Sequence, residues 1–287
     1  MAPSSPAFVW INGRILPAAE ARISPNDHGL LVGDGVFETL ISYAGVPFAC
    51  DRHWQRLRFS CETLGIPVPP ADTILQGMKE VLAANHMPDA RLRVTVTSGE
   101  GPLGSEKGDH PPTLVIACGA LKPWPDTETL TTVPWPRNER SALAGVKSIS
   151  YAENVRALAA ARSRSCGEAL FANTQGDLCE GTGSNIFLVT DQGVITPALS
   201  SGCLAGVTRA LVIELCHANG IPVLERLVTM GEIANCQEAF LTSTTREVQA
   251  IARIDSQVIP VAPGPVTKRL RALFKEMAAR FTAAAIS

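Results

Sequence analysis

The stretch Leu178-Cys179-Glu180-Gly181-Thr182-Gly183-Ser184-Asn185-Ile186-Phe187 places a single carboxylate at the start of a turn of small residues. Apolar residues flank this turn on both sides, and short apolar runs bounded by turn residues predict buried strands. We expect strands over residues 168–173 and 184–190. The pattern alone leaves two interpretations open: a tight connection with a solvated carboxylate, or a turn that directs Glu180 into a binding site.

Outward from this turn, the chain alternates strand-like and helix-like patterns. Strands are predicted over residues 8–11, 14–16, 36–43, 92–97, 113–118, 239–242 and 248–254, and helices over 51–64, 74–85, 151–165, 206–219 and 265–282. A proline-interrupted stretch at residues 119–128 predicts an interdomain linker. We therefore expect a small N-terminal α/β domain (1–118) with a mostly antiparallel sheet, and a larger C-terminal domain (129–287).

The composition narrows the class of protein. The chain has 287 residues, 46% of them hydrophobic, and 25 basic against 27 acidic residues, a balance that does not favour nucleic-acid binding. Residues 1–6 lack the pattern of a signal peptide. The eight cysteines form no C-x-x-C pair, which predicts buried free thiols in a reducing cytoplasm and no metal site.

Residues Gly99–Gly104 match the G-x-G-x-x-G pattern of dinucleotide-binding proteins. That interpretation requires a helix that opens directly after the glycines. The following segment, Ser105–Pro112, is polar and ends in two prolines, so it cannot begin a packed amphipathic helix. We expect a flexible loop here rather than a nucleotide site.

Lys147 differs from the other five lysines of the chain. It lies within the apolar stretch Leu143–Tyr151, whereas the others lie in polar loops or on amphipathic helices. An ammonium group is costly to bury unless it is paired or neutralised, and a desolvated lysine becomes a nucleophile for carbonyl groups. A lysine at the end of a strand that reaches solvent is the simpler interpretation of the same pattern.

Two further segments have the features of anion sites. Gly206-Val207-Thr208-Arg209 opens a predicted helix, whose first N–H groups and positive dipole end attract anions. Thr242-Ser243-Thr244-Thr245 ends a predicted strand with four hydroxyl groups, and backbone N–H groups in such a turn can cradle a phosphate. Each segment is equally compatible with an ordinary helix start or turn.

Taken together, these motifs resemble the class IV aminotransferase family, the pyridoxal 5'-phosphate (PLP) enzymes of fold type IV. The most specific matches are Gly145-Val146-Lys147, residues 180–185 and residues 206–209, and the resemblance covers nearly the whole chain. The family includes branched-chain and D-amino acid aminotransferases and 4-amino-4-deoxychorismate lyase. The fold it implies is α/β (α+β), with a small α/β sandwich domain and a larger pseudo-barrel domain.

The resemblance also implies a role for each matching residue. Lys147 is expected to hold PLP as a Schiff base and to move the proton at the substrate's Cα, and Glu180 to keep the pyridine nitrogen protonated. Leu204 is expected to pack near the ring. Contacts to the phosphate are expected from Arg56, Val207, Thr208, Ser243 and Thr244, and contacts to the substrate from Phe37, Arg93 and Tyr151. Arg93 is equally compatible with a structural ion pair.

The implied reaction is transfer of an amino group from an amino acid or primary amine to a 2-keto acid. The alternative is 4-amino-4-deoxychorismate lyase chemistry, which releases pyruvate and 4-aminobenzoate, and a PLP-binding protein without turnover is a third reading. Val32 and Ile41 stand where branched-chain aminotransferases carry tyrosine and arginine, which puts that specificity in doubt. The family is usually dimeric, so a homodimer is expected.

Overall fold

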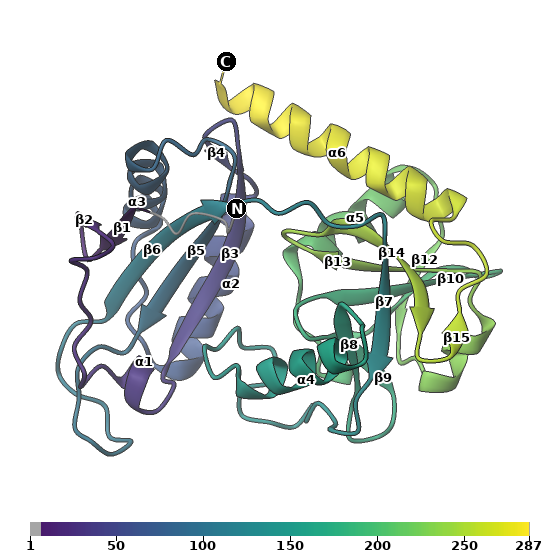
Figure 1. Cartoon of the computed structure of the whole chain (residues 1–287), viewed down its shortest axis with the longest axis horizontal. Coiled ribbons are helices and arrows are strands. Elements are labelled where there is room, and N and C mark those ends of the chain that lie inside the picture. The colour runs from purple at the N-terminus through teal and green to yellow at the C-terminus, as the bar shows by residue number, and fades with distance from the viewer. Residues whose placement is uncertain (1–6, 287) are drawn as a thin grey trace. The chain divides into compact units, whose positions relative to one another are not determined.

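The computed structural model describes residues 7–286, so the segment in which no signal peptide is predicted lies outside the described residues. The chain divides into two compact units. Unit 1 contains the residues up to Lys122, together with Val146–Ser150 and the segment from Arg280 onward, and unit 2 contains Pro123–Gly145 and Tyr151–Ala279. Each unit has its own sheet (Figure 1).

Unit 1 is a six-stranded sheet with two longer helices. The strands are β1 (Phe8–Ile11), β2 (Arg14–Pro17), β3 (Gly35–Tyr43), β4 (Val46–Pro47), β5 (Ala90–Thr97) and β6 (Thr113–Ala120), and the helices are α1 (His28–Leu31), α2 (Cys50–Leu64) and α3 (Ala71–Ala84). The strand order is β2-β1-β6-β5-β3-β4, and every pairing is antiparallel. The predicted antiparallel sheet with helices is therefore confirmed.

The core of unit 1 follows from alternation along its strands. In β5, Leu92, Val94 and Val96 are fully buried, whereas Arg91 and Arg93 between them are exposed. Because side chains alternate across a strand, the apolar set packs together on one face of the sheet. That face is covered by α2 and α3, which contribute buried apolar residues to the same core.

Unit 2 has a nine-stranded sheet. Its strands are β7 (Thr127–Thr132), β8 (Glu168–Ala172), β9 (Leu178–Gly181), β10 (Asn185–Thr190), β11 (Gly193–Pro197), β12 (Val223–Arg226), β13 (Glu238–Ser243), β14 (Glu247–Ile254) and β15 (Gln257–Val258). Its helices are α4 (Ala152–Ser163), α5 (Val207–Ala218) and the part of α6 (Pro265–Ile286) up to Ala279, with 3₁₀ turns at Leu199–Ser201 and Met230–Asn235.

The unit 2 sheet curls on itself. From β10 the order of paired strands runs β13-β14-β7-β8-β9, and β9 is joined back to β10 by the turn at residues 182–184. A sheet whose path returns to its starting strand must curve, which agrees with the predicted pseudo-barrel. The turn at residues 182–184 therefore links the two ends of the curve.

Several details differ from the sequence prediction. The predicted linker at residues 119–128 is shorter, because β6 extends to Ala120 and β7 begins at Thr127. Two segments from the predicted C-terminal domain, residues 146–150 and the residues from Arg280, belong to unit 1. Residues 146–150 do so because they form backbone hydrogen bonds with β3, and such long-range pairing leaves no local signal.

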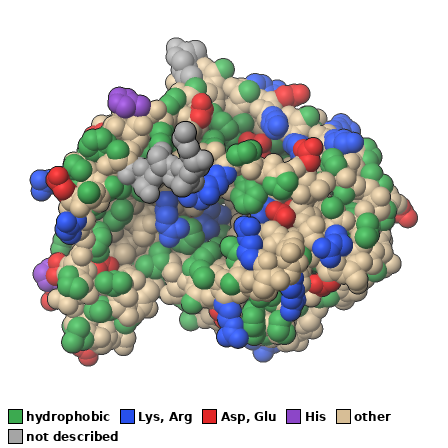
Figure 2. Space-filling view, viewed as in Figure 1, with side chains coloured by type: hydrophobic (Ala, Val, Ile, Leu, Met, Phe, Trp, Pro, Cys, Tyr) green, Lys and Arg blue, Asp and Glu red, His purple; other side chains and the backbone are tan. Residues whose placement is uncertain are grey.

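Residues 101–112 form an irregular connection between β5 and β6, with no helix after the glycine-rich pattern. None of the helices in residues 7–286 combines the length and apolar character needed to cross a bilayer. The cysteines are free thiols, and seven of the eight are buried, as predicted. On the right-hand part of Figure 2, which is unit 2, basic and acidic side chains are interspersed, in keeping with the near-neutral charge.

Candidate active site

The segment that carries Lys147 is fixed against β3 in unit 1. Its backbone is bonded on both sides: the Lys147 N–H donates to the Ser60 Oγ of α2 (3.2 Å), and the Lys147 carbonyl accepts from the Phe37 N–H (3.0 Å). The Ile149 N–H donates to the Gly35 carbonyl (2.9 Å) two residues further on. Hydrogen bonds of the main chain therefore fix the position of Lys147 independently of its side chain.

Two glycines permit this close approach. A Cβ atom on Gly35 would lie 2.7 Å from the Ile149 side chain and 2.8 Å from the Val96 carbonyl oxygen. Gly33 has a φ of +72°, and a Cβ there would meet the Ser150 Oγ at 2.6 Å. Side chains at these positions would push residues 149 and 150 away, so the Gly33-Asp34-Gly35 motif serves to seat the lysine segment.

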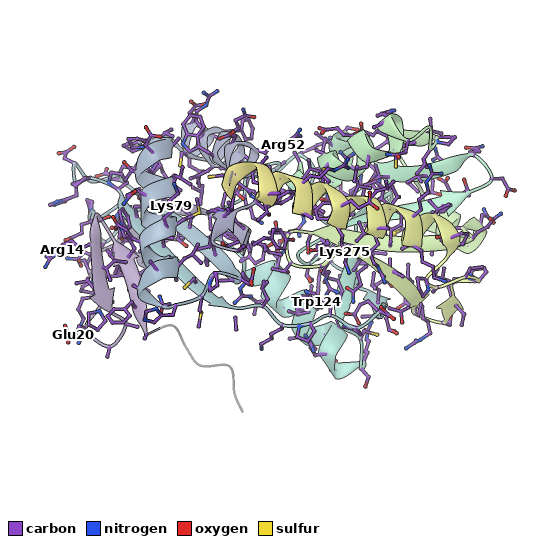
Figure 3. The ribbon with its side chains drawn as sticks, turned by 90° about the horizontal axis from the view of Figure 1, so that it is seen from above. Arg14, Glu20, Arg52, Lys79, Trp124 and Lys275 are labelled. Carbon is purple, nitrogen blue, oxygen red and sulfur yellow. The ribbon has the colours of Figure 1, made fainter. Side chains whose placement is uncertain are left out.

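The Lys147 side chain lies over an aromatic ring. Its Nζ is 4.4 Å from the centroid of the Phe37 ring, and the Cζ of Arg93 is 3.9 Å from the same centroid. Within residues 7–286, Lys147 is the only lysine that is half-buried; Lys79 on α3 and Lys275 on α6 are two of the exposed ones (Figure 3). The prediction that Lys147 has a distinct environment is confirmed.

Arg56 lies one helical turn from Ser60 on α2 and pairs with a buried carboxylate. Its Nε and Nη2 donate to the two oxygens of Glu38, each at 2.7 Å, and the His53 Nδ1 lies 2.7 Å from Glu38 Oε2. Burial alone would raise the pKa of Glu38, but the charge and hydrogen bonds of Arg56, aided by His53, lower that pKa to about 2. Burial lowers the pKa of His53 despite the neighbouring carboxylate.

This pairing engages one edge of the Arg56 guanidinium. The group carries five donors in a rigid fork, so Glu38 sets its orientation without using the whole donor set. A phosphate contact from Arg56 stays a prediction.

In unit 2, Glu180 lies on β9 and is held from two sides. Its Oε2 accepts a hydrogen bond from the Leu204 N–H (2.9 Å), and its Oε1 lies 3.3 Å from the Arg137 Nε. The carboxylate side chain is only 13% exposed. The solvated-carboxylate interpretation of the turn is therefore wrong, because Glu180 faces protein groups.

The turn that follows Glu180 is fixed by a buried ion pair. Glu168 accepts hydrogen bonds from the Thr182 hydroxyl (2.7 Å) and the Gly183 N–H (2.8 Å), and its other oxygen accepts from Arg246 (2.6 Å). On the other side of the turn, the hydroxyl of Tyr151 donates to the Thr182 carbonyl (3.2 Å). Arg246 directly follows Thr242–Thr245, the turn predicted to bind phosphate. The Glu168–Arg246 ion pair therefore connects that turn to the turn after Glu180.

The guanidinium of Arg246 is also stacked on an aromatic ring. Its Cζ lies 3.8 Å from the centroid of the Trp124 ring, which belongs to the connection before β7 (Figure 3). Stacking on one side and carboxylates on the other restrict the rotamers of this buried arginine.

Helix α5 begins beside the same turn. No side chain caps its first turn, at which Val207 and Thr208 are buried. Asn185, the first residue of β10, donates to the Leu204 carbonyl (2.9 Å), and a Cβ on Gly206 would lie 2.0 Å from its Oδ1. The loop Leu204–Gly206 is thus tied to the turn after Glu180.

The groups around α5 fit a phosphorylated cofactor. The hydroxyls of Ser184 and Thr242 are buried and have no hydrogen-bond partner among residues 7–286, and Thr242 pairs with Asn185 across β13 and β10. Ser243 is the last residue of β13 and Thr244 begins the turn that follows. Uncapped helix N–H groups, two unpartnered hydroxyls and a hydroxyl-rich turn supply the donors that a phosphate ester requires.

The predicted residues thus fall into two groups. Unit 1 brings together Lys147, Phe37 and Arg93, with Arg56 on the helix that contacts the lysine segment, and unit 2 brings together Glu180, Leu204, Val207, Thr208, Ser243, Thr244 and Tyr151 around the β9–β10 turn. Sequence reasoning missed Glu38, His53, Ser60, Arg137, Glu168 and Arg246. One signal was available: a carboxylate at Glu38, inside an apolar strand, requires a buried partner.

Comparisons with known proteins agree with this arrangement. The family model described as "Amino-transferase class IV" matches residues 35–254. A putative branched-chain-amino-acid aminotransferase of Methanocaldococcus jannaschii is 34% identical over 94% of this chain and 96% of its own length. A D-alanine aminotransferase of Bacillus licheniformis is 32% identical over 92% and 94%.

The fold has solved counterparts. The branched-chain amino acid aminotransferase of Thermobaculum terrenum, whose structure was determined in its PLP form, superposes with a TM-score of 0.87 at 30% identity, over 96% of this chain and 94% of that one. The family match covers both the lysine segment and the Glu180 turn, and the relatives match along almost their entire length. The chain belongs to the class IV aminotransferase family.

Proposed function

We propose that this chain is a PLP-dependent aminotransferase that moves an amino group between an amino acid, or a primary amine, and a 2-keto acid. The observation that carries the proposal is the fixation of Lys147. Its N–H and carbonyl are both bonded within unit 1, and among the lysines of residues 7–286 it alone is partly shielded from solvent. A lysine held in this way suits reversible reaction with a carbonyl group.

When bound, PLP supplies an electron sink for the electron pair left at the substrate's Cα. Lys147 would hold the cofactor through its aldehyde carbon, and its amine would carry the proton between the substrate's Cα and C4'. Glu180 accepts the N–H of the pyridine nitrogen, and the Leu204 N–H fixes the orientation of its carboxylate. The Leu204 side chain would pack near the ring.

The phosphate is held by donors from three elements. Val207 and Thr208 offer the first N–H groups of α5, and Ser243 and Thr244 offer the hydroxyl-rich turn after β13. Arg56 contributes a guanidinium whose orientation is set by Glu38. These groups would anchor the phosphate of the cofactor, and Lys147 would move the proton.

The substrate faces Phe37, Arg93 and Tyr151. The exposed guanidinium of Arg93 lies over the same Phe37 ring as the Lys147 amine. A substrate carboxylate bound by Arg93 would therefore lie close to the Lys147 amine. Arg93 also donates to the Thr95 hydroxyl (3.2 Å). Carboxylate recognition suits an amino acid better than a simple amine, which favours the amino acid as the donor.

The half-reaction spectrum tests this function. Purified protein loaded with PLP is mixed with single L-amino acids, D-amino acids and chiral amines, without an acceptor. We expect one class of donor to convert the PLP absorbance into that of pyridoxamine 5'-phosphate, which also identifies the handedness of the substrate. If no donor converts it, release of pyruvate from aminodeoxychorismate would support the lyase instead.

Substitution of the lysine provides a second test. Lys147→Ala is expected to abolish the lysine-linked absorbance of PLP and to lower turnover by at least about 1000-fold, because the proton carrier is lost. Lys275→Ala, at an exposed lysine on α6, is the matched control and should leave both readouts unchanged. Turnover of Lys147→Ala at the wild-type rate would rule out the assignment.

A further inference from the structure

Arg137 contacts the carboxylate that the proposed function places against the pyridine nitrogen. Its Nε lies 3.3 Å from Glu180 Oε1, and the two side chains are 17% and 13% exposed. This Nε is buried and makes no hydrogen bond, so its contact with Glu180 is one of charge without hydrogen-bond geometry. The other carboxylate oxygen accepts from the Leu204 N–H.

The position of Arg137 is fixed independently of Glu180. Its backbone N–H donates to the Ala172 carbonyl at 2.8 Å, and its guanidinium Cζ lies 4.4 Å from the centroid of the Phe171 ring. Both terminal nitrogens donate to Asn154 at 3.3 Å. Because Phe171 is the residue that pairs with Glu180 across β8 and β9, stacking on this ring places the cation beside the carboxylate.

Arg137 is a cationic neighbour of Glu180, and the other ionisable groups close to this pair are an exposed carboxylate and two thiols. Glu153 lies 3.2 Å from Arg137 Nη1, but its side chain is 71% exposed, so its charge is well screened. Burial, followed by the charge of Glu180, raises the pKa of Cys179. Burial also raises the pKa of Cys203, so both thiols stay neutral.

We propose that Arg137 is a positioning residue that acts through Glu180 to keep the pyridine nitrogen of bound PLP protonated. The inference rests on the proposed function. A proton shared between the ring nitrogen and Glu180 has two limiting states: a pyridinium beside a carboxylate, or a neutral ring beside a carboxylic acid. A cation beside the carboxylate stabilises the first state, because it lies nearer to the negative end of the pair than to the positive end.

The size of the effect follows from this geometry. An opposite charge within about 4–6 Å changes the protonation equilibrium of a carboxylate by roughly 10- to 1000-fold. Removal of the Arg137 charge is therefore expected to move the ratio of pyridinium to neutral pyridine by at least about tenfold. The electron sink would weaken accordingly, since a neutral ring withdraws electrons less strongly.

Nitrogen-15 NMR of protein loaded with PLP that carries ¹⁵N in the ring tests the inference, since the shift of that nitrogen separates pyridinium from neutral pyridine. We expect a pyridinium resonance in the wild type, a shift toward the neutral value in Arg137→Gln, and a pyridinium resonance again in Arg137→Lys, which keeps the charge. Arg140→Gln is the matched control, because Arg140 lies three residues away and is 81% exposed.

Each other outcome has a defined meaning. A pyridinium resonance in Arg137→Gln would overturn the inference, because Glu180 would then suffice by itself. Loss of that resonance in Arg137→Gln and Arg137→Lys alike would also overturn it, since the shape of the arginine rather than its charge would matter. Wild-type protein that binds no PLP would instead refute the proposed function, which separates the two failures.

Discussion

At the scale of single residues, the most consequential side chain outside the predicted set is Glu38. It is 1% exposed and accepts from both Arg56 and His53, so one buried carboxylate sets the orientation of two side chains of α2. Removal of one partner of a buried ion pair leaves the other charge uncompensated. Glu38 therefore links the stability of unit 1 to the placement of an expected phosphate contact.

Glu38 predicts how stability depends on pH. Its pKa is lowered from 4.5 to about 2, so its contribution is complete above pH 4.5 and is lost as the pH falls through about 2. The lowered pKa of His53 acts in the same direction, because the folded state binds fewer protons. Denaturant titrations between pH 7 and pH 2 should show wild-type stability falling by on the order of 3 kcal/mol through Glu38.

The variant Glu38→Gln isolates this effect. We expect it to be less stable at neutral pH by roughly 3–5 kcal/mol and to lose the acid dependence below pH 4.5. Glu62→Gln is the control: Glu62 lies on the same helix as Arg56, 3.5 Å from Arg58 in an exposed pair that contributes about 0.3–0.5 kcal/mol. An unchanged acid slope in Glu38→Gln would show that the carboxylate is not the responsible group.

At the scale of elements, the contact between β3 and residues 146–150 decides where Lys147 lies. Gly35→Ala would place a methyl group 2.7 Å from the Ile149 side chain and 2.8 Å from a carbonyl oxygen of β5. We expect a loss of roughly 1–3 kcal/mol and weaker PLP binding, because the lysine segment must move away from β3. Gly119→Ala, in β6, is the control, since a Cβ there meets nothing within 4 Å.

Equilibrium unfolding and a PLP titration measure the two effects. If Gly35→Ala loses stability but keeps its PLP affinity, the Ile149 side chain moves without displacing Lys147. Equal behaviour of the two alanine variants would contradict the close approach itself.

The elements also show what the sequence could predict. Helix α2 and strand β5 were predicted because their apolar residues recur at helical and alternating spacing, which burial on one face requires. Strand β7, with the sequence Thr-Glu-Thr-Leu-Thr-Thr, was not. It lacks such spacing and is a strand because it pairs in parallel with β14 and β8, more than thirty residues away.

The residues of the candidate site likewise fall into those that the sequence could predict and those that it could not. Lys147 and Glu180 were singled out because a charged residue in an apolar run or a small-residue turn is conspicuous in one sequence, and the family resemblance then gave each an expected role. Arg137, Glu168 and Arg246 were not, because each is significant only through a partner brought close by the sheet, such as Arg246 and Glu168 across 78 residues. A single sequence indicates which side chains are unusual and does not indicate which ones meet.

At the scale of the whole molecule, the family resemblance predicts a homodimer. Light scattering at several protein concentrations should give about twice the 30.4 kDa mass of the chain. A monomer mass at every concentration would refute this prediction.

Unit 1 is assembled from three separate segments of the chain, which affects how it folds during synthesis. Its sheet is translated first, but the edge of β3 at residues 35–37 is paired only after Val146–Ser150 has been synthesised. The Phe48 ring is likewise covered only after synthesis of Phe281, whose ring packs edge-on against it at a centroid distance of 5.2 Å. A nascent chain that ends near residue 122 would therefore present an open strand edge and an uncovered aromatic ring, both of which invite association. The ribosome must synthesise most of unit 2 before unit 1 can close.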